Sequence, residues 1–369
     1  FLDKYPSSAD AAHVMFRLAE LYFERAEEDY ATRDEEFRRV MDEMSQTGNL
    51  DEIPEEPKKD YKKSVRLYQR ILRDHPEYEY LDGTYYMLGY CLSEPASAQH
   101  DEEEGLAMFQ ALVDRFGDSR FAAVAHLRVG EYYFDYNKLD EAMPHYQRVV
   151  DLEGPEGSLY DEGLYKLAWS RYKKSEYDTA LGLLNGLLDW SSANYERTGR
   201  ESAMAPEAIE YTAISFSDMA DRKGIPPIAV AQQFYVDVGQ REFEPKVYKR
   251  LADVLVQQAR YEDAVAVYTY IQDRWPNDPE NPDYQWQLGT LYMSMVPPRA
   301  DLAQKAIADL NDRYNDDSPW YQANRANPDA QAVARGYIEK SLAAAATQLH
   351  GKAAETGAPG DYLKASELY

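Results

Sequence analysis

Chemically reactive side chains are dispersed along this chain and form none of the usual catalytic patterns. The sequence contains no GxxxxGK(S/T) phosphate loop, HExxH zinc helix, GxSxG nucleophile turn or paired CxxC motif. Because catalysis needs several such groups at one place, the sequence predicts no enzyme active site and no cofactor. The six histidines are equally scattered: His13, His75, His100, His126, His145 and His350.

Two short runs are rich in the oxygen ligands that calcium accepts, Asn277-Asp-Pro-Glu-Asn281 and Asn315-Asp-Asp317. Neither run has the alternating ligand spacing and the glycine of an EF-hand loop. Helix termination explains both runs better than calcium does, so we predict no metal site. The one cysteine, Cys91, is expected to be a small buried apolar residue. A single cysteine cannot form a disulfide within the chain and says nothing about the redox compartment.

Aromatic side chains are the other chemical resource, because the chain has 32 tyrosines. Tyrosine and tryptophan rings anchor protein partners at low entropic cost, but they also fill cores. Which of the two applies depends on the elements that carry the rings.

Those elements follow from the segment between Ala123 and Pro155. Gly130 and Ala142 lie twelve residues apart, and apolar side chains surround both at helical spacing. This pattern predicts two amphipathic helices joined by a tight turn. A pair of this length cannot bury its apolar faces alone and needs similar pairs on either side.

The twelve-residue step recurs along the chain. Ala168 to Ala180 and Ala252 to Ala264 repeat it without a gap, and Gly89 to Gly105 and Gly289 to Ala303 repeat it with small insertions. Small residues at both ends let the facing helix backbones approach closely. A glycine or proline follows twelve residues after several second small positions, as at Pro76, Gly117, Gly154 and Pro276, where it ends the second helix.

This pattern resembles the tetratricopeptide repeat, a two-helix unit of about 34 residues, over most of the chain. Three phrases at the ends of second helices are similar to those of bacterial cell-envelope repeat proteins: Phe1-Leu-Asp-Lys-Tyr-Pro6-Ser-Ser, Leu112-Val-Asp-Arg-Phe-Gly117-Asp-Ser and Ile271-Gln-Asp-Arg-Trp-Pro276-Asn-Asp. That group includes BamD-like proteins, TolA-binding CpoB-like proteins and the long repeat arrays of gliding-motility machines. The resemblance implies an all-α fold, a solenoid of antiparallel helix pairs, and a periplasmic or outer-membrane-associated location.

In this family the first helix of each repeat lines a concave face, at positions −3, +1 and +4 from its small residue. Projected onto this chain, the frame predicts a partner-binding groove whose leading residues are Tyr86, Tyr90, Glu131, Tyr165, Trp169, Tyr172, Lys249 and Trp286. Phe16, Glu20 and Phe134 fall in the same frame. The alternative is that tight winding buries these rings against the next repeat. The two alternatives are balanced for Tyr165 and Trp169, whereas burial is favoured for Phe16 and Phe134.

The same frame excludes one specialised use and assigns one histidine. Repeat proteins that clamp a C-terminal carboxylate resemble one another in a Lys/Asn/Arg set at these positions. The +1 positions here contain no asparagine, so a carboxylate clamp is not expected: Glu20, Tyr90, Glu131, Trp169, Asp253 and Thr290. His126 stands where first helices of the family carry a large packing residue, and we expect it in the core.

Charge excludes two classes of partner. The chain has 40 Lys and Arg against 66 Asp and Glu, a formal net charge of −26, which would repel nucleic acid and anionic lipid. Solvation of a long repeat array is the simpler reason for this acidity. No stretch approaches the ~20 apolar residues of a membrane span, so we expect no membrane insertion of this segment.

Repeat spacing suggests three parts. Residues 1–190 hold N-terminal repeats with an acidic insertion at about 24–60, residues 191–240 a polar linker and an irregular helix pair, and residues 241–369 C-terminal repeats. The fourth repeat is expected to end at about Asp189, before a polar segment from Ser191 to Ala203. A loop is expected from Asp316 to Asp329, then a helix from Ala330 to His350 and a glycine-rich connection from Gly351 to Gly360. The first half of the insertion can extend a helix through Met44, and Gly48 to Pro57 is expected to be a loop. The insertion is either a protrusion that contacts a partner or a tolerated surface loop.

Both ends look like interrupted repeats. Phe1 to Pro6 is typical of the last turn of a second helix, and Asp361 to Tyr369 of the first half of one, with Ala365 at the small position. We therefore expect a piece of a longer protein.

The sequence thus predicts a non-enzymatic scaffold that binds helical or extended segments of other proteins, within an assembly at a bacterial cell envelope. Two alternatives remain. In one, the chain is a structural subunit that contacts a large complex through its convex face and loops. In the other, it recruits substrates for a longer enzyme.

Overall fold

The computed structural model describes residues 10–48, 53–357 and 359–368, together with residues 2, 4 and 8. These residues form α-helices α1 to α17 and no strand; one isolated β-bridge joins Lys59 to Ser97. The all-α prediction is confirmed. The chain divides into two compact units, Phe1–Ser175 and Glu176–Tyr369, here called the N-terminal and C-terminal units.

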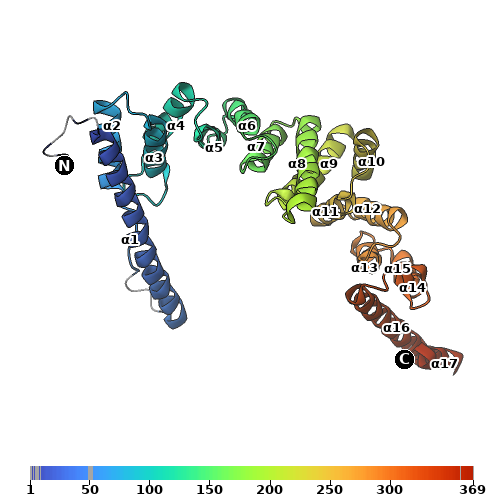
Figure 1. Cartoon of the computed structure of the whole chain (residues 1–369). Coiled ribbons are helices and arrows are strands. Elements are labelled where there is room, and N and C mark those ends of the chain that lie inside the picture. The colour runs from blue at the N-terminus through green and yellow to red at the C-terminus, as the bar shows by residue number, and fades with distance from the viewer. Residues whose placement is uncertain are drawn as a thin grey trace. The chain divides into compact units, whose positions relative to one another are not determined.

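The N-terminal unit is built from consecutive helix pairs (Figure 1). Each helix packs against the next one along the chain, which buries both faces of the inner helices and forms the predicted solenoid of helix pairs. The helices are α1 (Ala11–Thr47), α2 (Lys62–Asp74), α3 (Leu81–Ser93), α4 (Glu102–Arg115), α5 (Ala122–Asp135), α6 (Leu139–Glu153) and α7 (Tyr160–Lys173).

The C-terminal unit follows the same rule with one irregular junction. There α9 packs on α8, α10 and α11, so the pair made by α9 and α10 is not a simple repeat. The helices are α8 (Tyr177–Thr198), α9 (Ala205–Lys223), α10 (Pro227–Val238), α11 (Glu244–Gln257), α12 (Tyr261–Arg274), α13 (Asn281–Ser294), α14 (Ala300–Tyr314), α15 (Pro319–Ala323), α16 (Pro328–Thr356) and α17 (Pro359–Leu368).

Small residues hold the paired helices together, as their spacing predicts. A Cβ atom at Gly130 of α5 would lie 2.6 Å from the Tyr146 ring of α6, and one at Gly289 of α13 would lie 2.7 Å from Ile307 of α14. In the first pair, Ser64 is fully buried and its hydroxyl donates to the carbonyl oxygen of Ala19 at 3.0 Å. A larger side chain at either glycine would force the facing Tyr146 or Ile307 side chain to move.

The three gapless steps share a turn that sequence spacing alone does not reveal. Seven residues after the first small position, Asn137, Ser175 and Ala259 all adopt left-handed φ values of 55°, 59° and 56°. Asparagine tolerates this conformation, whereas for alanine it costs on the order of 1–2 kcal/mol. The tight turn is therefore imposed by the packing of the helices and not by local preference.

Three segments expected to be irregular contain helix. The polar segment Ser191 to Ala203 begins inside α8, which continues to Thr198 and ends at Gly199 with φ 74°. The expected loop Asp316 to Asp329 contains α15, capped by Ser318. The glycine-rich connection from Gly351 is helical as far as Thr356, because one exposed glycine in a run of alanines costs only about 1 kcal/mol. The three-part division itself stays a prediction.

The helix expected from Asp361 is present as part of α17, whereas the prediction for the N-terminal end concerns mostly undescribed residues. Of the helix turn expected at Phe1 to Pro6, only Leu2 and Lys4 are described, and the side chain of Ala365 lies outside the described set.

Candidate functional site

The predicted groove residues of α3 pack on neighbouring repeats. Tyr86 stacks face to face on Phe121, with ring centroids 4.8 Å apart and planes inclined by 12°. Tyr90 meets the edge of Phe23 from α1 at 5.7 Å. Both tyrosines are half-buried, so part of each ring already serves repeat-to-repeat packing.

On α5 and α7 the rings are packed more tightly. Trp169 lies 4.6 Å from Phe134 and 5.9 Å from Tyr165 between ring centroids. Tyr165 is only 8% exposed. Glu131 of α5 accepts from Lys166 of α7 at 3.0 Å. These contacts favour burial for Tyr165, one of the two alternatives left open by the sequence.

Two predicted groove residues lie in the C-terminal unit. Trp286 of α13 stacks on Tyr337 of α16 at 5.2 Å, and Lys249 of α11 bonds to Asp253 one turn on, at 3.2 Å. Tyr172 of α7 is half-buried. Ring contacts thus join neighbouring repeats within each unit: Tyr86 with Phe121 and Phe134 with Trp169 in the N-terminal unit, and Trp286 with Tyr337 in the C-terminal unit. Partner binding by the predicted groove residues stays a prediction.

One part of the same first-helix face is open. A cavity of about 990 Å³ lies between α1, α3 and the loop that precedes α5. Phe16 and Glu20, two positions of the predicted frame, line it. We call it the N-terminal cavity; its lining residues are His13, Phe16, Arg17, Glu20, Glu79, Tyr80, Asp82, Gly83, Met87, Asp118, Ser119, Arg120 and Phe121.

Gly83 keeps the floor of this cavity open. A Cβ atom there would lie 3.4 Å from Phe121 and 3.5 Å from Phe16, which is ordinary van der Waals contact. A methyl group therefore fits, whereas a longer side chain would fill the space between the two rings. The frame misses Gly83, because it lies six residues before the small position, and misses Phe121, because that residue precedes its helix. A glycine inside an otherwise regular helix was the available signal.

Polar side chains form the rim of the N-terminal cavity. Arg17 donates to Glu20 at 2.6 Å, and the Asp82 carboxylate accepts from the Ser119 hydroxyl at 2.6 Å. The Arg120 guanidinium lies over the Phe121 ring at 4.6 Å. The Asp82–Ser119 bond joins α3 to the loop that precedes α5, whereas the other two contacts are local.

The acidic insertion forms a second structural feature, which we call the arm. It consists of α1 beyond Ala26 and the return segment 53–60. Helix α1 does continue through Met44, as its spacing predicts, and ends at Gly48 with φ 70°. Figure 1 shows α1 extending well beyond α2 and α3. Of the loop expected from Gly48 to Pro57, residues 49–52 lie outside the described set.

Lys59 anchors the base of the arm. Its side chain is 13% exposed, and its ammonium lies 3.2 Å from Glu27 and 3.8 Å from Glu94. Burial alone would lower the pKa of Lys59, but its hydrogen bond to Glu27 and the nearby carboxylates raise it overall. Tyr61 donates to the same Glu27 carboxylate. The Lys59 backbone also bonds to Ala96 and Ala98, each at 2.8 Å.

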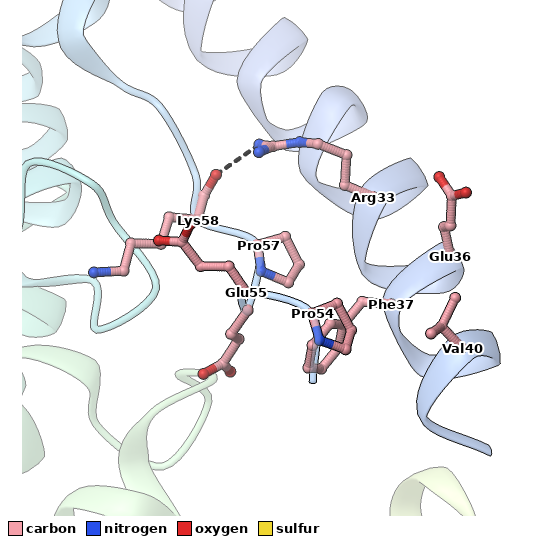
Figure 2. A pocket seen from close by; sticks show the side chains of 9 residues that line it. Arg33, Glu36, Phe37, Val40, Pro54, Glu55, Pro57 and Lys58 are labelled. Carbon is pink, nitrogen blue, oxygen red and sulfur yellow. Dashed lines mark hydrogen bonds between the residues drawn. The ribbon is translucent and has the colours of Figure 1, made fainter. Parts of the chain in front are cut away.

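A smaller cavity of about 460 Å³ lies within the arm. Figure 2 shows Phe37 and Val40 of α1 facing Pro54 and Pro57 of the return segment, with Arg33 donating to the Lys58 carbonyl oxygen at 2.6 Å. The arm is therefore docked at its base and has, further along α1, a recess lined by both apolar and charged side chains.

Two histidines meet between α5 and α6. The Nδ1 atoms of His126 and His145 are 2.9 Å apart, so one ring donates and the other accepts. Burial, followed by the neighbouring His145, lowers the pKa of His126 to about 4, and burial also lowers that of His145. His126 is 9% exposed, which confirms the prediction that it lies in the core. No pattern in the sequence indicates that His145 is its partner.

Neither a metal-binding cluster nor a membrane-spanning helix is present in the described residues. No group of three or more His, Cys, Asp or Glu side chains in that part of the chain is arranged to hold a metal ion. No helix of the same part is long and apolar enough to cross a membrane.

Successive helix pairs with small residues at their contacts define a helical-repeat protein. Residues 13–78, which include α1 and α2, match the model of the tetratricopeptide repeat family. This segment is therefore a tetratricopeptide repeat, as the residue pattern predicts. None of the curated proteins with which the chain was compared matches it.

Several solved structures match at low identity. The apo form of RapI is 12% identical over 96% of this chain and 97% of that one, with a TM-score of 0.40. The C-terminal part of a repeat-containing protein from Cytophaga hutchinsonii is 13% identical over 86% of this chain and 98% of that one, with a TM-score of 0.35. YrrB, described as a TPR protein with an unusual peptide-binding site, is 13% identical over 62% of this chain and 96% of that one, with a TM-score of 0.27. At these values the matches carry no argument about function.

Proposed function

We propose that this chain is a protein-interaction scaffold and that a segment of a partner protein binds in its N-terminal cavity. The observation that carries the proposal is the cavity itself. It opens on the first-helix face of α1 and α3, where the family frame predicts partner contacts, and it remains open although Phe121, which lines it, also stacks on Tyr86.

The cavity has the composition of a protein-binding site. Phe16, Met87 and Phe121 supply apolar surface, and Tyr80 at the rim is 46% exposed. Large apolar rings surrounded by polar groups are typical of binding hot spots. The internal contacts of Arg17 and Asp82 preorganise the rim, which reduces the entropy lost when a partner binds.

Site-specific photo-crosslinking tests this proposal. A photoreactive amino acid at Met87, inside the cavity, should crosslink to one partner protein in the source cells. The matched control is Leu21, which also lies in the N-terminal unit but is 59% exposed and outside the cavity. A crosslink that is equally strong from both positions, or absent from Met87, would contradict the proposal.

The arm supports a second candidate, a subunit that contacts a large complex through its insertion. The Lys59 anchor shows that the insertion is docked against the repeats, and the recess between Phe37 and Pro54 exposes apolar surface at a distance from the N-terminal cavity. A Phe37→Asp/Val40→Asp variant separates the candidates. Loss of partner binding in this variant, with full binding by a cavity variant, would favour the arm.

We further propose that the assembly lies at a bacterial cell envelope. Support comes from the similarity of the phrases at Leu112 to Ser119 and Ile271 to Asp278 to those of envelope repeat proteins. Fractionation of source cells tests it: recovery with the periplasm or outer membrane is expected, and recovery with cytoplasmic markers would contradict it.

A further inference from the structure

The rim of the N-terminal cavity has an imbalance of charge. It carries four carboxylates, from Glu20, Glu79, Asp82 and Asp118, and two guanidinium groups, from Arg17 and Arg120. Both guanidinium groups already make internal contacts. Arg17 is bonded to Glu20 at 2.6 Å, and Arg120 lies over the ring of Phe121 at 4.6 Å.

Two of the four rim carboxylates, Glu79 and Asp118, make no ion pair within the described residues. Glu79 precedes α3 and Asp118 precedes α5, and both are exposed on the rim. No ion pair joins either of them to a cation within the described residues. Asp82 differs, because its carboxylate accepts from the Ser119 hydroxyl and the Gly83 amide. The rim therefore offers negative charge at Glu79 and Asp118.

The floor beneath these carboxylates is apolar. Phe16 and Phe121 lie on either side of Gly83, and Met87 lies one turn further along α3. A ligand that fills the cavity must bring an aromatic or aliphatic group to the floor and a cation to the rim. An acidic or phosphorylated segment would be repelled, because its negative charge would face the carboxylates of the rim and the field of a chain with net charge −26.

We propose that the N-terminal cavity recognises a partner segment in which a lysine or arginine adjoins an aromatic or aliphatic side chain. This inference rests on the proposed function and adds the chemistry of the partner. The apolar side chain occupies the space above Gly83, and the basic side chain pairs with Glu79 or Asp118. Charge complementarity at the rim sets the preference, and the rings on the floor supply most of the contact area.

Fluorescence anisotropy with two labelled peptides tests the preference. The peptides have about 12 residues, a length typical of groove-bound segments, and are identical except that lysines flank a phenylalanine in one and glutamates flank it in the other. The lysine peptide should bind at least about tenfold more tightly at low salt and lose much of this advantage at high salt. Equal binding, or tighter binding of the glutamate peptide, would overturn the inference.

Matched variants locate the effect. Glu79→Gln/Asp118→Asn should weaken binding of the lysine peptide by about fivefold, a typical size for exposed charge pairs. Glu103→Gln/Glu141→Gln removes the same charge from exposed positions on α4 and α6 and should have a much smaller effect. Equal effects of the two double variants would mean that general attraction, and not the rim, selects the peptide, and would overturn the inference.

A third variant distinguishes failure of the charge preference from failure of the proposed function. Gly83→Leu places a side chain between Phe16 and Phe121, whereas Gly83→Ala adds only a methyl group that the site accommodates. Binding should be lost in Gly83→Leu and kept in Gly83→Ala. If the unchanged protein binds both peptides equally and Gly83→Leu blocks both, the cavity binds protein segments but the charge preference is wrong. If it blocks neither, the cavity is not the binding site and both proposals fall.

Discussion

The first-helix face of the N-terminal unit is packed differently in two places. Between α5 and α7, Trp169 fills the space against Phe134, with ring centroids 4.6 Å apart. Between α1 and α3, Phe16 and Phe121 flank Gly83, and a cavity of about 990 Å³ remains. The same face of the same kind of helix is closed by rings in one place and left open in the other.

This difference separates packing from recognition. A ring stacked on the next repeat contributes mainly to the stability of the solenoid, because its apolar surface is already removed from water. A ring beside an open cavity keeps apolar surface for a partner. Substitutions in the closed region should therefore change the free energy of unfolding, and substitutions around Gly83 should change binding.

The largest effect is expected for Trp169→Ala. Removal of this ring takes away contacts with Phe134 and Tyr165, and we expect the free energy of unfolding to fall by about 3 kcal/mol. Tyr80→Ala at the cavity rim should change it by less than about 0.5 kcal/mol, because the ring is 46% exposed. Denaturant unfolding followed by circular dichroism checks both values. Similar losses in the two variants would remove the distinction between the closed and open regions.

The histidine pair should make the closed region sensitive to acid. His126 has a pKa lowered to about 4 by burial and by His145, with Arg148 lowering it further and Asp114 raising it, whereas an unfolded histidine titrates near 6.5. Between these values the unfolded chain binds the extra proton, so stability is full above about pH 6.5 and falls by roughly 3 kcal/mol toward pH 4.

The control for this effect is His126→Leu, which removes the titrating group but keeps an apolar side chain. Unfolding free energies of both proteins should be measured from pH 7.5 to 4, the range that spans these pKa values. As pH falls, the unfolding free energy of the unchanged protein should decrease more than that of His126→Leu. Any advantage of the unchanged protein at pH 7.5 should therefore narrow or reverse. Curves that stay parallel over this range would show that the pair does not couple folding to protonation.

A smaller effect is expected at the close helix contacts. Gly130→Ala forces a methyl group to within 2.6 Å of the Tyr146 ring and should destabilise the protein by about 1–2 kcal/mol. Gly182→Ala in α8 has nothing within 4 Å of the new Cβ atom and should stabilise by about 0.5–1 kcal/mol. Calorimetric melting temperatures should therefore move in opposite directions. A shift of the same sign in both would mean that Gly130 is not a packing position.

The smallest global effect is expected at the arm. Lys59→Met leaves the carboxylates of Glu27 and Glu94 without their shared cation, which should loosen the return segment and leave the other repeats intact. Hydrogen exchange of the residue 59 and Ala98 amides, both bonded across the base of the arm, should accelerate by about tenfold. This factor corresponds to a decrease of about 1.4 kcal/mol in the free energy of local opening. Unchanged exchange there would show that the backbone bridge alone holds the arm.

Sequence reasoning predicted most of the fold because the helix contacts depend on residue size at a fixed interval. Gly130 and Ala142, or Gly289 and Ala303, are identified by spacing alone, and the structure confirms their burial. Helix ends were harder. Thr198 and Thr356 lie beyond the expected ends, because polar residues and glycine continue a helix whose earlier turns are already packed.

The candidate site was predicted only in part, since the repeat frame identifies a face of each first helix but not what covers it. Phe16 and Glu20, two positions of that frame, line the cavity, although the sequence favoured burial for Phe16. It could not show that Tyr86 would stack on Phe121, or that His126 would meet His145, because these contacts join residues on different helices. Only the three-dimensional packing of successive repeats decides which rings remain available.

The most direct test of the account is the affinity of the crosslinked partner for the Gly83→Leu and Gly83→Ala variants, measured by titration calorimetry on proteins of equal thermal stability. The account predicts that Gly83→Leu weakens binding by at least about tenfold, or 1.4 kcal/mol, and that Gly83→Ala binds like the unchanged protein. Equal affinity of both variants for the partner would contradict it.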